Sequence, residues 1–161
     1  VPPGARMTDF LEDVLTQAVA AALAHVERGG IPFVGVVVDG DRVISEFGVN
    51  RVHETGDLTA HAEIVAIRDA LTASGRSHLR GATLLATGEP CGMCYRYALD
   101  AGITDIRVAV TRDEVAALGF DYRNSYPAFG ITNTIRDTHM RPLRAPGDTE
   151  PFSRFLTLHS I

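Results

Sequence analysis

The chain has 161 residues, of which 45% are hydrophobic and 22% charged, so it is long enough for one globular domain with a sizeable core. Its formal net charge of −5 disfavours a nucleic-acid groove, which needs clustered Lys and Arg. No apolar run approaches the roughly 20 residues that span a bilayer, so no membrane-spanning helix is expected. Two cysteines, three positions apart, are too few for a disulfide framework and indicate a reducing compartment, the cytoplasm.

Residues 1–6 precede a plausible start at Met7, and we expect them to be a cloning remnant or a disordered natural extension. The start lacks a charged region followed by an apolar block, so no signal peptide is expected. Residues 7–161 contain no repeat and no low-complexity segment, and they are expected to form a single domain.

The first half of this domain predicts a helix, a hairpin and a second helix. Asp9 and Glu12 form a helix-start signal, and apolar residues then recur at helical spacing as far as Gly29. The valine-rich run 33–38 predicts a buried strand, and 42–47 predicts the returning strand of a hairpin. The polar stretch 48–58 is typical of a loop that reaches into a site, and a helix is predicted from 60 to 73.

The second half predicts two more strands and three more helices. A strand is expected at 83–87, a helix that Pro90 opens, a strand at 106–110, and a short helix that begins with a capping box at Thr111 and ends at Gly119. Residues 120–150 are rich in Pro, Asn, Asp and Gly and receive no assignment, whereas 152–159 has amphipathic helical spacing. Strands that alternate with helices after a hairpin predict an α/β domain, with α/β/α layers around a mixed sheet.

Two short motifs carry the chemistry. Cys91 and Cys94 lie three residues apart, so both sulfurs face one side of the first turn of a helix, whose positive end favours thiolates. His61 begins another helix, and the three side chains supply the ligands of a catalytic Zn²⁺ site with one open position. Glu63, two residues after His61, points off the ligand face and suits a proton carrier.

Plainer interpretations of the same residues exist. A lone Cys-x-x-Cys can be a thioredoxin-like redox pair, and a structural zinc site would need a fourth protein ligand. His61 alone would be an ordinary helix-start histidine. The remaining histidines are expected to be structural or on the surface, with His53 the one candidate to line a pocket; they are His25, His53, His78, His139 and His159.

The motifs Thr59-Ala60-His61-Ala62-Glu63 and Glu89-Pro90-Cys91-Gly92-Met93-Cys94 resemble those of the cytidine deaminase superfamily. The resemblance implies a three-layer α/β/α fold with a central mixed five-stranded sheet. It implies one Zn²⁺ per chain on His61, Cys91 and Cys94, with Glu63 moving protons during hydrolytic deamination of a base. It also implies that residues 7–161 form a deaminase domain of purine or pyrimidine metabolism that assembles as a homodimer.

The chain is most similar to the bacterial guanine deaminases of that superfamily, over most of residues 9–160. The similarity implies that Asn50 hydrogen-bonds the base and that Phe33 walls the pocket, whereas a turn asparagine and a core phenylalanine are the structural alternatives. Ala62, Asp121 and Tyr122 are further candidate substrate contacts. In that branch the C-terminal segment closes the partner's site, so 152–159 is either exchanged between subunits or packed as an ordinary terminal helix. The matching segments also include Pro32-Phe33, Gly48-Val49-Asn50, Gly119-Phe120-Asp121 and Pro151-Phe152.

Three departures leave the substrate open. Tyr122 stands where the guanine branch carries a second acid, Tyr95-Arg96-Tyr97 replaces small residues, and Leu58 replaces a proline. A guanine-type purine, a cytosine-like or modified base, and an aminotriazine therefore all stay possible, as does cytosine or cytidine itself. Two rivals remain: a tRNA adenosine deaminase, disfavoured by the acidic charge, and a zinc-binding module without catalysis.

Overall fold

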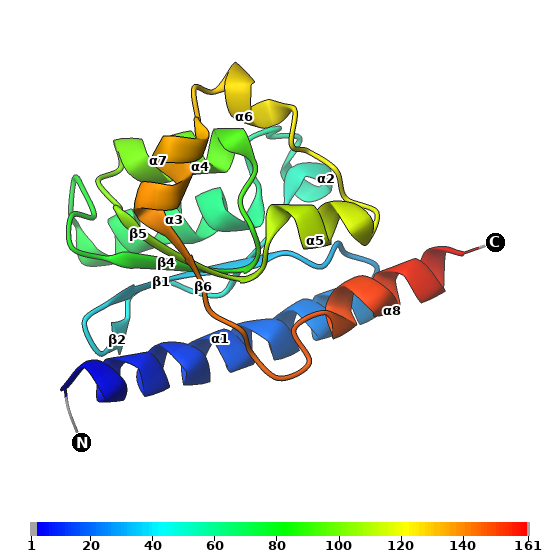
Figure 1. Cartoon of the computed structure of the whole chain (residues 1–161), viewed down its shortest axis with the longest axis horizontal. Helices are drawn as coiled ribbons and strands as arrows, with labels where there is room; N and C mark the ends of the chain where they lie inside the picture. Colours follow the sequence, from blue (N-terminus) through cyan, green and yellow to red (C-terminus); the bar gives the residue numbers. More distant parts are fainter. Residues whose placement is uncertain (1–2, 161) are drawn as a thin grey trace.

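The structure is a computed structural model that describes residues 3–160, and it has a central sheet with helices on both faces (Figure 1). Val1 and Pro2 of the expected extension lie outside the described residues, whereas residues 3–6 already belong to the first helix. The helices are α1 (Pro3–Glu27), α2 (Val52–Thr55), α3 (Ala62–Ser74), α4 (Gly92–Asp100), α5 (Arg112–Ala117), α6 (Ser125–Ala128), α7 (Asn133–His139) and α8 (Glu150–His159). The strands are β1 (Val34–Asp39), β2 (Arg42–Val43), β3 (Gly48–Val49), β4 (Thr83–Gly88), β5 (Asp105–Val110) and β6 (Met140–Pro142).

The sheet is mixed, as predicted, but it has six strands where five were expected. Its order is β2-β1-β4-β5-β6; β1 pairs antiparallel with β4, while β4, β5 and β6 run parallel. The predicted return strand 42–47 is split into β2 and β3, and both pair with β1. The register shifts by two residues between the pairs Val38↔Val43 and Val34↔Val49. The returning strand therefore carries a bulge of two extra residues, which divides it into β2 and β3.

Each face of the sheet buries one cluster of apolar side chains. Helices α1 and α8 lie side by side against one face (Figure 1), and the cluster there includes Leu15 of α1, Val36 of β1 and Phe152 of α8. Helices α3 and α4 cover the other face, where Ile67 and Leu84 are fully buried. The three-layer α/β/α prediction is therefore confirmed.

Several element boundaries differ from those predicted. Helix α1 begins at Pro3, six residues before the expected start at Asp9, because its first turns stay regular and the Asp9–Glu12 pair falls inside the helix. Pro90 does not open α4; Cys91 is its N-cap and Gly92 its first residue. The capping box at Thr111 and Glu114 is present as predicted. The unassigned stretch 120–150 folds into α6, α7 and β6.

Helix α8 packs on its own chain. It lies along α1, Arg154 donates to the Glu27 carboxylate at 2.5 Å, and Phe152 is fully buried. Within residues 3–160, no helix combines the length and the apolar character needed to cross a membrane.

Candidate active site

The predicted metal ligands lie at the starts of two neighbouring helices. His61 is the N-cap of α3 and Cys91 the N-cap of α4, and both have the extended backbone that an N-cap adopts. Two glycines let the strands approach the first turn of α3. A Cβ on Gly35 would lie 2.9 Å from Cα of Glu63, and one on Gly48 would lie 2.4 Å from the carbonyl oxygen of Ala62.

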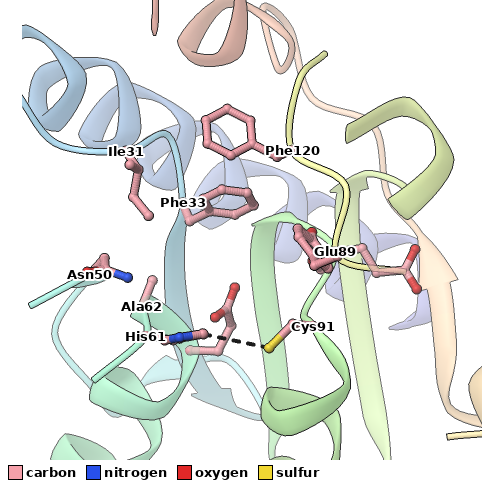
Figure 2. Close-up of a pocket in the computed structure, with 10 residues that line it drawn as sticks. Ile31, Phe33, Asn50, His61, Ala62, Glu89, Cys91 and Phe120 are labelled. Atoms are coloured by element: carbon pink, nitrogen blue, oxygen red, sulfur yellow. Dashed lines mark hydrogen bonds between the residues drawn. The ribbon is translucent and has the colours of Figure 1, made fainter. Parts of the chain in front are cut away.

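The three ligand atoms form a small triangle. Nδ1 of His61 lies 3.6 Å from Sγ of Cys91 (Figure 2). It lies 3.5 Å from Sγ of Cys94, and the two sulfurs are 3.6 Å apart. A tetrahedral zinc ion with Zn–S of about 2.3 Å and Zn–N of about 2.0–2.1 Å sets S···S edges of about 3.8 Å and S···N edges of about 3.6 Å. The triangle therefore fits zinc. Within the described part of the chain, it is the one group of His, Cys, Asp or Glu side chains whose ligand atoms lie close enough together to hold a metal ion.

The electrostatics of this group favour a cation. The hydrogen bond with Cys94 lowers the pKa of the Cys91 thiol to about 4, with a further contribution from His61, which favours the thiolate form that zinc binds. Both the hydrogen bond to Cys91 and burial raise the pKa of the Cys94 thiol. Burial, followed by the charge of Cys91, raises the pKa of the Glu63 carboxyl to about 7. A group with a pKa near the working pH is suited to both accept and return a proton.

A cavity of about 230 Å³ opens beside these ligands. Ile31, Phe33 and Phe120 form its apolar side, opposite His61 and Cys91 (Figure 2). The aromatic side chains hold one another edge to face: the ring centroids of Phe33 and Phe120 are 5.3 Å apart, and those of Phe33 and Tyr122 are 6.0 Å apart. The cavity has an apolar, aromatic side and a polar, metal-binding end; its lining residues are Ile31, Phe33, Asn50, His61, Ala62, Glu63, Glu89, Cys91, Phe120 and Tyr122.

Asn50 and Tyr122 present different hydrogen-bonding groups to this cavity. The side-chain oxygen of Asn50 accepts the backbone N–H of Val52 at 3.1 Å, and its amide nitrogen points into the cavity (Figure 2). Asn50 is thus a turn asparagine that also offers N–H donors. The hydroxyl of Tyr122 donates to the carbonyl oxygen of Glu89, so its proton is not available to a ligand.

The structure separates Asp121 from the other predicted substrate contacts. Phe33, Asn50, Ala62 and Tyr122 line the cavity, but Asp121 is exposed and its carboxylate accepts hydrogen bonds from Arg123 at 2.8 and 2.9 Å. Asp121 is therefore held at the surface by Arg123 and does not line this cavity, and its contact with a substrate stays a prediction. His53 is exposed on α2 and is not among the lining residues.

Three lining residues were not predicted as site residues: Ile31, Glu89 and Phe120. Glu89 belongs to the cysteine motif, but the motif predicts no role for it. A polar residue directly after a buried parallel strand would have been the signal, because such strand ends are where α/β sites form. The run Tyr95-Arg96-Tyr97 is structural: Tyr95 is buried on Glu89, Arg96 donates to backbone oxygens of α6 and its turn, and Tyr97 packs against Arg68.

Residues 8–110 match the family model for the cytidine and deoxycytidylate deaminase zinc-binding region. The tRNA-specific adenosine deaminase of Agrobacterium fabrum is 46% identical over 90 residues, which cover 56% of this chain and 56% of that protein. The guanine deaminase of Bacillus subtilis is 37% identical over 111 residues, which cover 68% of this chain and 70% of that protein.

The solved guanine deaminase of Nitrosomonas europaea has a TM-score of 0.73 at 21% identity and covers 89% of this chain and 82% of that chain, a likeness of fold alone. The chain spans 19% and 21% of the length of two tRNA(Ile)-lysidine synthases that it also matches, from Deinococcus radiodurans and Deinococcus deserti.

Proposed function

The chain belongs to the zinc-binding cytidine and deoxycytidylate deaminase family, and from this premise we propose that it is a zinc-dependent hydrolytic deaminase of a nucleobase. Water replaces an exocyclic amine on the ring, a carbonyl remains, and ammonia leaves. The observation that carries the proposal is the His61, Cys91 and Cys94 triangle, of which His61 and Cys91 line a cavity that Glu63 also lines.

Each residue of this wall has a part in the reaction. His61, Cys91 and Cys94 would hold zinc, which supplies Lewis-acid chemistry by lowering the pKa of water toward about 7. Glu63 accepts a proton from the attacking water and delivers it to a ring nitrogen. It then passes a proton to the departing amine, which leaves as ammonia. Its buried carboxyl can do both because its pKa lies near neutrality.

The shape and polarity of the cavity support a free, planar base as the substrate. Its 230 Å³ lies below the roughly 300–1,000 Å³ of pockets for drug-sized ligands. Phe33 and Phe120 offer aromatic, apolar surface, and the Asn50 amide offers N–H donors to an acceptor such as a ring carbonyl or ring nitrogen. A guanine-type purine has an acceptor edge beside its exocyclic amine, and a related amino-pyrimidine or aminotriazine also meets these requirements.

A tRNA adenosine deaminase is the second candidate, because the Agrobacterium fabrum enzyme is 46% identical over 90 residues. Against it stands the net charge of −5, since binding an RNA backbone draws on clustered cations. Most arginines that the structure describes are already paired with carboxylates, for example Arg123 with Asp113 and Asp121.

An ammonia-release screen tests the proposal on guanine, cytosine, adenine, their nucleosides and aminotriazines, beside a filter-binding assay with tRNA. We expect turnover of at least one free base. Glu63→Gln should keep stoichiometric zinc but lose about 10²–10⁴-fold in kcat, the usual contribution of a general acid–base group. Glu54→Gln, on an exposed carboxylate of α2, is the matched control and should be fully active. Full activity of Glu63→Gln, or tight salt-sensitive tRNA binding without base turnover, would refute this proposal.

We further propose a homodimer, on the strength of the resemblance to the guanine branch. Helix α8 supports the aromatic wall of the cavity from within the same chain, through Phe152 and Phe155. Light scattering measures the oligomer, and exchange of α8 between subunits would give crosslinks between chains from cysteines engineered into α1 and α8.

A further inference from the structure

Glu89 has the most heavily hydrogen-bonded side chain next to the metal centre. Its carboxylate is fully buried and accepts Nε and Nη2 of Arg136 at 2.5 and 2.8 Å, and the backbone N–H of Arg112 at 2.8 Å. The hydroxyl of Tyr95 donates to it at 2.6 Å, and the hydroxyl oxygen of Tyr126 lies 3.2 Å away. Partners from α4, α5, α6 and α7 therefore meet on one carboxylate, which points away from the cavity (Figure 2).

The backbone around Glu89 is held as firmly as its side chain. Its N–H donates to the carbonyl of Val110 at 2.9 Å, and its own carbonyl accepts the hydroxyl of Tyr122. The next carbonyl, that of Pro90, accepts the hydroxyl of Tyr126 at 2.6 Å. The residue after Pro90 is Cys91, which supplies one sulfur of the triangle. A short run of backbone thus joins the carboxylate network to a metal ligand and to an aromatic wall of the cavity.

We propose that Glu89 is a positioning residue: its network with Arg136 fixes the backbone that carries Cys91 and the wall that carries Tyr122. Its effect on turnover rests on the proposed function, whereas its effect on the metal does not. A buried ion pair is weak evidence for stability, because well-packed apolar residues can often replace one without loss. The position of this ion pair, next to a metal ligand, therefore accounts for its presence better than a contribution to the free energy of unfolding does. Groups that orient metal ligands from behind change metal affinity or activity about 10–100-fold when they are altered.

Arg136→Lys is the main test, because lysine keeps the positive charge but cannot donate two parallel hydrogen bonds to one carboxylate. Arg76→Lys is the matched control: it makes the same change in the partly buried ion pair with Asp39, at 2.8 Å, which touches none of the residues that line the cavity. Glu89→Gln removes the carboxylate charge at nearly constant shape. Tyr95→Phe removes a single hydroxyl from the network. It still tests the proposal if Arg136→Lys or Glu89→Gln does not fold.

The readouts are zinc release to a chromophoric chelator, the visible spectrum of the cobalt-substituted protein, and kcat and KM on the best base of the ammonia screen. We expect Arg136→Lys and Glu89→Gln to release zinc about 10–100-fold faster than the wild type and to shift the cobalt bands. Tyr95→Phe should change the rate of zinc release and the cobalt bands in the same direction, but to a smaller extent. We also expect kcat to fall more than KM rises, because a displaced ligand misplaces the reacting groups.

Other results separate the alternatives. If the folded variants melt at a lower temperature but release zinc and absorb as the Arg76→Lys control does, Glu89 only stabilises the fold and the proposal is overturned. If the wild type deaminates no base, the proposed function fails, while zinc release and the cobalt spectrum still decide the role of Glu89.

Discussion

Replacing Phe152 by alanine tests whether α8 is part of the core that supports the cavity. The Phe152 ring is fully buried, with its centroid 5.4 Å from that of Phe33 and 6.1 Å from that of Phe120. Removing a buried phenylalanine ring costs about 3–5 kcal/mol, of which each edge-to-face pair accounts for about 0.5–1.5 kcal/mol. A domain of this length loses roughly 2–4 °C per kcal/mol, so Phe152→Ala should melt roughly 6–20 °C lower.

Thermal unfolding followed by circular dichroism measures this shift, at two protein concentrations. Leu158→Ala is the control on the same helix: Leu158 is 45% exposed, and surface changes of this kind stay within about 0.5 kcal/mol. Phe152→Ala should also raise KM more than the control, because Phe33 loses the ring behind it. If both variants melted alike, α8 would not pack as described. A shift that depended on protein concentration would indicate that association of subunits contributes to the effect of Phe152.

Three further predictions follow from the packing, the capping box and the metal site. Gly48→Ala should lower the free energy of unfolding by roughly 1–3 kcal/mol or more in a denaturant titration, because its Cβ would lie 2.4 and 2.8 Å from backbone atoms of Ala62 and Ala66; an unchanged midpoint would contradict that close approach. Partial burial of Glu114 acts to raise its pKa, but hydrogen bonds from Thr111 and Arg144 hold this pKa below its usual value. An acid whose pKa is lowered by folding stabilises the protein above its unfolded pKa, and it loses that effect as the pH falls through its folded pKa. The difference in melting temperature between wild type and Glu114→Gln should therefore shrink below about pH 4. Zinc removal by a chelator should lower the melting temperature and added zinc should restore it, and a melting curve indifferent to both would count against a metal centre.

The parts of the fold that were predictable have local signals. The valine run gave β1, apolar spacing gave α1, α3 and α8, and the box at Thr111 and Glu114 gave α5. The stretch 120–150 gave no such signal, because distant partners hold it: Arg136 of α7 pairs with Glu89, and β6 pairs with β5. No periodicity within the stretch itself could reveal those partners.

The site was predictable to the extent that its chemistry is written in short motifs. His61, Cys91 and Cys94 come together as their spacing suggested, and Phe33, Asn50, Ala62 and Tyr122 line the same cavity. Asp121 lies outside the cavity, because it pairs at the surface with Arg123, two residues away, a contact that the motif does not reveal. Phe120 was quoted for its resemblance alone, and its role as a wall depends on Phe33 and Phe152 from opposite ends of the chain.

The triangle of ligand atoms joins His61 to Cys91, 30 residues later in the chain. His61 begins the helix that covers the antiparallel hairpin, and Cys91 begins the helix that follows the first of the parallel strands. An ion held between them acts as a cross-link between the two halves of the sheet in the folded chain. Hydrogen exchange after metal loss should therefore rise first along the seam between β1 and β4, where the two halves meet.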